Sequence, residues 1–171
     1  MHRITVKDMA IIAVLAALLF AQEQLLSFLP NVQLTVFLMV LYSKALGFIR
    51  TSLIVIIHTI LDNLFMASFN IAYFPFMLIG WMIIPIVVCS LLKKCESPLL
   101  LALMGILFSF IYSWLFIIPN VIILDVNALD YFIADIIYEI ILAASSFITI
   151  LWLYKPCRNV LNNIMNKEAK N

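Results

Sequence analysis

The chain is short of charged residues. Its 171 residues include only 10 Lys or Arg and 9 Asp or Glu, while 66% are hydrophobic and the mean hydropathy is +1.18. A soluble domain needs more polar side chains than this to cover its surface, so a soluble protein is excluded and we expect an integral membrane protein. The length suits one membrane domain over residues 1–171, without a soluble appendage, and we expect no nucleic-acid partner.

The chain also lacks the motifs of common enzymes. It contains no HExxH, no GxSxG and no phosphate-binding loop. The cysteines are odd in number and lie near the ends of segments that we expect in the cytosol, which is typical of reduced thiols: Cys89, Cys95 and Cys157. We therefore expect a protein that is not an enzyme and has no cofactor and no metal. Any ATP hydrolysis that it depends on would take place on another chain.

The hydrophobic residues form continuous runs, separated by Pro, Asn, Gly or paired basic residues. Such runs predict helices, because the strands of a membrane barrel would alternate apolar and polar residues. Each run is near the length that a helix needs to cross the hydrocarbon layer. The prediction is an all-α membrane protein, a bundle of six transmembrane helices at roughly 8–29, 32–48, 52–69, 73–92, 98–119 and 130–154.

The basic residues sort to one side of this layout. They precede the first span, occupy the turns between spans two and three and between spans four and five, and follow span six in the tail 155–171. Positively charged connections stay in the cytoplasm, so both termini are expected there, in a multi-pass protein of the bacterial cytoplasmic membrane. The connections on the other side, at 68–70 and 119–130, carry no basic residue. The second is apolar enough that we expect it to fold back onto the bundle as a lid.

Polar side chains gather in the outward half of the predicted spans. Ionisable groups at this depth are costly, so each needs a partner, a cavity or a task. His58 and Asp62 lie one turn apart on one face of the third span. The groups that we expect to line a polar pocket open to the outside are Glu23, Asp62, Asn63, Asp135 and Glu139. The alternative is that they form hydrogen bonds between helices and only fix the geometry of the bundle.

Aromatic residues supply walls for such a pocket. Trp81 and Trp114 lie deeper than the interfacial aromatics Tyr73 and Phe74, which are typical of a membrane-interface belt. We expect the two tryptophans to stack against a planar ligand.

Two other functions fit the same polar residues. His58 with Asp62, and Asp135 with Glu139, have i, i+4 spacing that suits metal ligands or acid–base catalysis, so an intramembrane enzyme using these four is one alternative. A stand-alone carrier of a small solute or ion is the other. In the absence of any recognised catalytic motif, neither is favoured.

The first span carries a stripe of small residues. At about 100° per residue, Ala10, Ala13, Ala17 and Ala21 share one narrow face. Helices in lipid associate through close van der Waals approach, which small residues four apart permit, so the stripe is a candidate docking face. The alternative is that it packs against this protein's own helices.

Three segments resemble the substrate-binding S components of energy-coupling factor (ECF) vitamin transporters. They are the opening 5–18 (TVKDMAIIAVLAAL), the start of the last span 131–139 (YFIADIIYE) and the small-residue stretch 143–146 (AASS). The AxxxA motif of that family maps onto Ala13 and Ala17. The resemblance implies a subunit of an ABC-type importer that captures a vitamin-like molecule at the outer face. A transmembrane coupling subunit, which binds the AxxxA face, and two ATPase subunits on separate chains would drive its reorientation.

The chain differs from the metal-transporting members of this family at its N-terminus. They also begin with Met-His, but this chain continues Arg-Ile-Thr, and its basic N-terminus is expected in the cytoplasm, so a metal substrate is not expected. Acids without an outward Lys or Arg instead favour a small cationic or donor-rich heterocycle.

Overall fold

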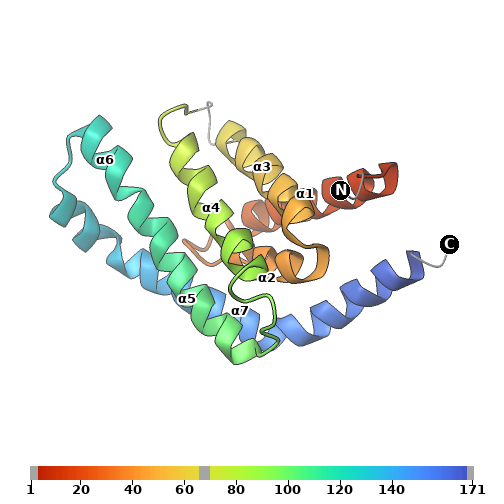
Figure 1. The fold of residues 1–171 in the computed structure, drawn as a ribbon. Helices are drawn as coiled ribbons and strands as arrows, with labels where there is room; N and C mark the ends of the chain where they lie inside the picture. The colour runs from red at the N-terminus through yellow and green to blue at the C-terminus, as the bar shows by residue number, and fades with distance from the viewer. Residues whose placement is uncertain (1–3, 66–69, 169–171) are drawn as a thin grey trace.

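The computed structural model describes residues 4–65 and 70–168, and this part of the chain is helical and contains no strand (Figure 1). The all-helical part of the prediction is confirmed for these residues, and their long apolar helices are compatible with a membrane helical bundle. The predicted end of the third span, the connection at 68–70 up to residue 69, and the chain ends lie outside the described residues. The helices are α1 (Val6–Leu26), α2 (Thr35–Leu46), α3 (Phe48–Phe65), α4 (Phe74–Cys89), α5 (Pro98–Leu115), α6 (Ile117–Leu124) and α7 (Ala128–Glu168).

Local sequence signals determine where several helices begin and end. Thr5 and Asp8 form a capping box at the start of α1, each side chain bonding the other's backbone N–H. Ser97 caps α5 ahead of Pro98, which suits the first turn because it has no N–H to satisfy. Gly47, at φ 79°, separates α2 from α3 in a backbone conformation that side chains rarely adopt.

Four helical segments in the described residues are long and apolar enough to cross a membrane, namely Val6–Leu26, Phe48–Phe65, Pro98–Leu124 and Ala128–Ile164. The predicted spans 32–48 and 73–92 correspond to shorter apolar helices, α2 with 12 residues and α4 with 16. At 1.5 Å per residue these cover about 18 and 24 Å, less than a hydrocarbon layer of about 30 Å. The Gly47 turn and the non-helical stretch before Thr35 shorten α2 at its two ends.

The short helix α2 lies at the centre of the molecule, in contact with α3, α4, α5, α7 and α1 (Figure 1). Every residue from Thr35 to Ser43 is buried. A helix that is apolar on all sides belongs in such a position. The outer helices instead expose large apolar side chains, such as Val6, Leu25 and Trp152, each more than 70% accessible. A surface of this kind is matched to lipid rather than to water.

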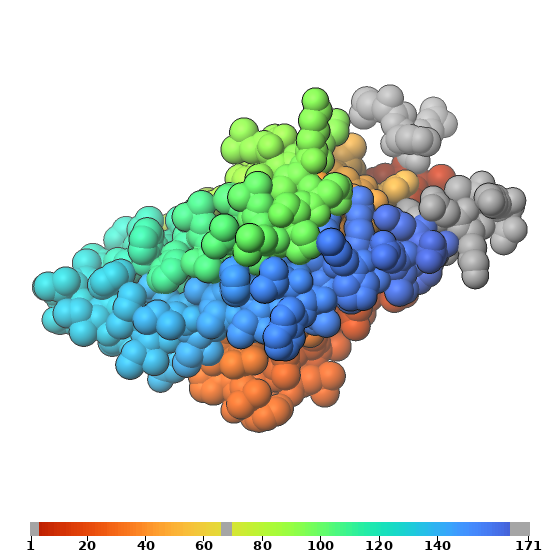
Figure 2. Space-filling view, turned by 90° about the horizontal axis from the view of Figure 1, so that it is seen from below, coloured from red at the N-terminus to blue at the C-terminus, as the bar shows by residue number. Residues whose placement is uncertain are grey.

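The helices α5 and α7 pack side by side along the molecule (Figures 1 and 2). Gly105 allows this close approach, since a Cβ built there would lie 2.6 Å from Cδ1 of Ile150. One turn on, the hydroxyl groups of Ser109 and Ser146 are hydrogen-bonded at 2.9 Å and fully buried. Small residues and interhelical hydrogen bonds are the usual means of helix association in membranes.

Two segments differ from their predicted forms. The connection 119–130 was expected to fold back as a lid, but α6 prolongs α5 beyond Phe116 and its Ile122 is 74% exposed. A continued helix satisfies its own backbone hydrogen bonds, which a loop lying in lipid could not do. The last span was predicted to end at 154, whereas α7 continues through Pro156 to Glu168.

Lys44 anchors the end of the bundle where the basic residues gather. Its side chain is only 3% exposed, donates hydrogen bonds to the carbonyl oxygens of Leu92 and Lys93 at 3.1 and 3.0 Å, and lies 3.3 Å from the Glu96 carboxylate. Tyr154 donates a further hydrogen bond to Glu96. Partial burial raises the pKa of Glu96, but the Tyr154 hydrogen bond and the Lys44 charge outweigh it and hold this pKa below its ordinary value.

Replacing Lys44 with Met is expected to lower the free energy of unfolding by about 2 kcal/mol, because the carbonyl groups of Leu92 and Lys93 and the Glu96 carboxylate lose a charged donor that is itself buried. Thermal unfolding in detergent would measure the change. The control is Lys94→Met, which removes an exposed charge from the same connection and should leave stability unaltered. Equal stability of the two variants would show that the Lys44 contacts contribute nothing.

Candidate ligand-binding site

A cavity of about 670 Å³ lies at the end of the bundle opposite Lys44. The helix α1 begins beside Arg50, whose guanidinium is 2.8 Å from Asp8, and ends near the cavity. Amide, hydroxyl and carboxylate groups line the cavity together with aromatic rings. The described residues of its wall are Glu23, Gln24, Ser27, Asn31, Gln33, Asp62, Asn63, Phe65, Asn70, Tyr73, Met77, Trp81, Tyr112, Phe116, Asn120 and Tyr131.

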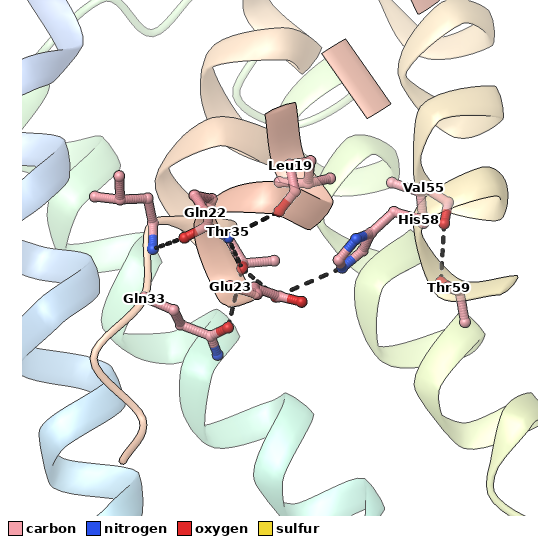
Figure 3. Close-up of polar contacts among 9 residues, drawn as sticks. Leu19, Gln22, Glu23, Gln33, Thr35, Val55, His58 and Thr59 are labelled. Carbon is pink, nitrogen blue, oxygen red and sulfur yellow. Dashed lines mark hydrogen bonds and ion pairs between the residues drawn. The ribbon is translucent and has the colours of Figure 1, made fainter. Parts of the chain in front are cut away.

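The carboxylate of Glu23 is held from two sides (Figure 3). The Thr35 hydroxyl at the start of α2 donates a hydrogen bond to Glu23 Oε1. On α3, Nε2 of His58 lies 3.5 Å from the same oxygen, a distance at which a protonated imidazole forms an ion pair. His58 is fully buried and neither of its ring nitrogens has a hydrogen-bond partner in the described structure. Side chains from three helices thus converge on this wall of the cavity.

Gln22, near the end of α1, holds the connection between α1 and α2 in place through hydrogen bonds. Its amide nitrogen donates to Thr35 Oγ1 at 2.8 Å, and its amide oxygen accepts from the backbone N–H of Leu34 at 2.8 Å (Figure 3). Ser145 on α7 secures the same connection, because its hydroxyl accepts from the N–H of Gln33 and donates to the carbonyl of Gln33. The connection between α1 and α2 is therefore fixed at both sides as a wall of the cavity.

Asp62 and Asn63, at the end of α3, have different surroundings. Asn63 is buried, and its amide oxygen accepts a 2.7 Å hydrogen bond from the backbone N–H of Asn70. This bond positions the start of the segment that leads to α4. Asp62 also lines the cavity, but no hydrogen bond or ion pair joins its carboxylate to another described residue.

Aromatic rings from α4 and α5 form another part of the wall, where the ring centroid of Trp81 lies 6.4 Å from that of His58. The rings of Trp81 and Tyr112 are stacked, with centroids 3.7 Å apart and planes 21° from parallel. Tyr73 donates a 3.0 Å hydrogen bond to the amide oxygen of Asn120 and stacks on Phe116. A wall of this composition can hold a flat ring while the polar groups facing it satisfy donors on the ring's edge.

Four of the seven predicted binding residues thus line the cavity: Glu23, Asp62, Asn63 and Trp81. The structure places the other three away from its wall. Trp114 is 46% exposed and donates a 3.2 Å hydrogen bond to Oε2 of the buried Glu139, and Asp135 is half-buried on the same helix as Glu139. The His58, Asp62, Asp135 and Glu139 group that an enzyme would use therefore does not come together at the cavity. Within the described residues, no three His, Cys, Asp or Glu side chains form a metal-binding group.

Tyr112 is the residue of this wall that the prediction missed in favour of Trp114. Tyr112 and Trp114 are two positions apart on a helix, so their side chains point about 200° apart and cannot both face the cavity. The signal lies in Gly105 and Ser109, whose small side chains mark the packed face of α5 and which share that face with Tyr112. Trp114 falls on the opposite face.

The alanine stripe of α1 faces outward. Ala10, Ala13, Ala17 and Ala21 are all exposed, whereas Ile12, Ala16 and Leu19 on the other face are buried. The stripe therefore does not pack against any helix in the described part of the chain, which was the alternative to a docking face.

No family model, curated protein or solved structure matches the chain.

Proposed function

We propose that this chain is the substrate-binding S component of an ECF-type ABC importer in a bacterial cytoplasmic membrane. In this proposal α2 and α4 cross the membrane with the four long helical segments, and both termini lie in the cytoplasm. The cavity opens outward and captures a small, vitamin-like heterocyclic molecule. A coupling subunit and two ATPase subunits on other chains drive its delivery to the inside.

The observation that carries the proposal is the separation of two features on α1. Near the end of this helix, Glu23 lines the cavity, while the alanine stripe runs along an outer face that none of the described helices covers. A binding subunit that is moved by a partner needs both a ligand cavity and a free docking face. A stand-alone carrier needs only the cavity.

The experiment that tests the proposal is native mass spectrometry of the protein purified from its host membrane in mild detergent. We expect one membrane partner and two ATPase subunits to copurify, together with a bound small molecule. A protomer that carries ligand but never a partner would contradict the S-component assignment and favour the stand-alone carrier.

A further inference from the structure

The charge that faces the cavity is negative. Its described wall carries the carboxylates of Glu23 and Asp62 and no Lys, Arg or His, and its other polar groups are neutral amides and hydroxyls. An anionic ligand would meet two carboxylates without a counter-charge. At membrane depth such repulsion is not screened by water, so an anion is disfavoured.

The two carboxylates are not equivalent. Glu23 accepts a hydrogen bond from Thr35 and lies 3.5 Å from the fully buried imidazole of His58. Glu23 therefore has two polar neighbours within the protein. Asp62 lies one turn after His58 on α3 and also lines the cavity, but it has no hydrogen bond or ion pair with any described residue. A carboxylate in this position requires a partner that the described part of the chain does not supply.

We propose that the cavity takes a small planar monocation and that Asp62 pairs with its charge, while Glu23 stays paired with His58. This inference rests on the proposed function only in taking the cavity as the nutrient site. The half-buried ring of Tyr112, stacked on the fully buried Trp81, forms the wall for the flat part of the ligand, and aromatic faces also attract cations. A volume of about 670 Å³ suits a molecule of vitamin size. A dication would need a second carboxylate without a hydrogen bond or ion pair, which the described wall does not offer.

The test uses three probes on the purified full-length protein in detergent, with binding measured by equilibrium dialysis. They are N-methylacridinium, a planar monocation; acridine at mildly alkaline pH, its nearly isosteric neutral counterpart; and methyl viologen, a dication. We expect N-methylacridinium to bind at least about tenfold more tightly than the other two. Equal affinity for N-methylacridinium and acridine would overturn the proposal without any variant.

Variants then test which of the two carboxylates pairs with the positive charge of the ligand. Asp62→Asn should weaken N-methylacridinium binding on the order of 30-fold or more and leave acridine binding unchanged. Glu23→Gln should cause a much smaller loss, and Asp62→Glu should keep the preference for the cation. The control is Asp130→Asn, which removes an exposed acid that does not line the cavity. A preference for the cation that survives in Asp62→Asn would overturn the role of Asp62, and acridine binding reports that this variant is folded.

The two proposals can fail separately. A protomer without partners that still binds the monocation through Asp62 would refute the S component and support the assignment of the cavity. A complex with coupling and ATPase subunits whose cavity does not distinguish cation from neutral probe would refute the charge assignment alone.

Discussion

Replacing Ala13 or Ala17 with Trp is expected to abolish ATP-driven ligand uptake and the copurification of the coupling subunit. Both alanines are exposed on the outer face of α1, where a flat surface allows another helix to approach closely. An indole side chain would hold the two helix surfaces several ångströms further apart, and the contacts that favour association in lipid would be lost. Ligand binding should stay at the wild-type level, since neither residue lines the cavity. Uptake into cells and pull-down of the partner would measure the two effects.

The matched control for these variants is Ala144→Trp, the same substitution at an exposed position of α7. It places an indole against lipid without touching the alanine stripe, so uptake should persist. Unchanged uptake in Ala13→Trp and Ala17→Trp would contradict a docking role for this face of α1. A parallel loss of binding and uptake would indicate misfolding, and the smaller substitution Ala17→Leu would then separate docking from folding.

Replacing Gly105 with Leu is expected to destabilise the protein by about 3 kcal/mol, the upper part of the range for an overpacked core. Even a Cβ at this position meets Ile150 Cδ1 at 2.6 Å and Ser146 Cβ at 3.6 Å, so a full leucine side chain must push α5 and α7 apart. This would also break the buried hydrogen bond between Ser109 and Ser146. Helix propensity acts in the opposite direction, because Leu favours helix over Gly by up to about 1 kcal/mol. The loss can therefore be attributed to packing.

Thermal and denaturant unfolding in detergent would measure this change. Gly105→Ala is the graded comparison: the Ile150 methyl group can rotate away from a single added carbon, so its effect should be much smaller. Ala144→Leu adds a leucine to an exposed position of α7 and should be nearly neutral. Wild-type stability in Gly105→Leu would show that α5 and α7 are not held in close contact at this point.

The sequence was a reliable guide where the physical signal is local or concerns the whole composition. Low charge and long apolar runs require helices in lipid, because only a helix or a closed barrel satisfies its backbone there. Cap residues such as Thr5 and Ser97 determine where helices begin. Polar and aromatic residues within the apolar runs predicted Glu23, Asp62, Asn63 and Trp81 as pocket residues, and these four line the cavity.

The length and path of the shorter helices were less predictable. A hydrophobic run such as 32–48 has the composition of a membrane span, yet α2 covers only 12 residues and is enclosed by other helices. The connection 119–130 was expected to fold back as a lid, yet its first residues, up to Leu124, belong to the helix α6 that prolongs α5. Apolar residues serve equally against lipid and against protein, so composition does not distinguish the two environments.

By itself, the sequence determined that the chain is all-helical with long apolar helices, where α1 and α5 begin, and which polar residues lie within the apolar runs. Only the tertiary structure decided which of these groups meet. The rotation of each helix about its axis turns Tyr112 to the cavity and Trp114 away and joins Glu139 to Trp114. It also places Glu23 beside Thr35 and His58, while Asp62 has no hydrogen bond or ion pair with another described residue. Rotation is set by close packing between helices distant in sequence, as at Gly105 and Ile150, and a single sequence does not encode those contacts in any local pattern.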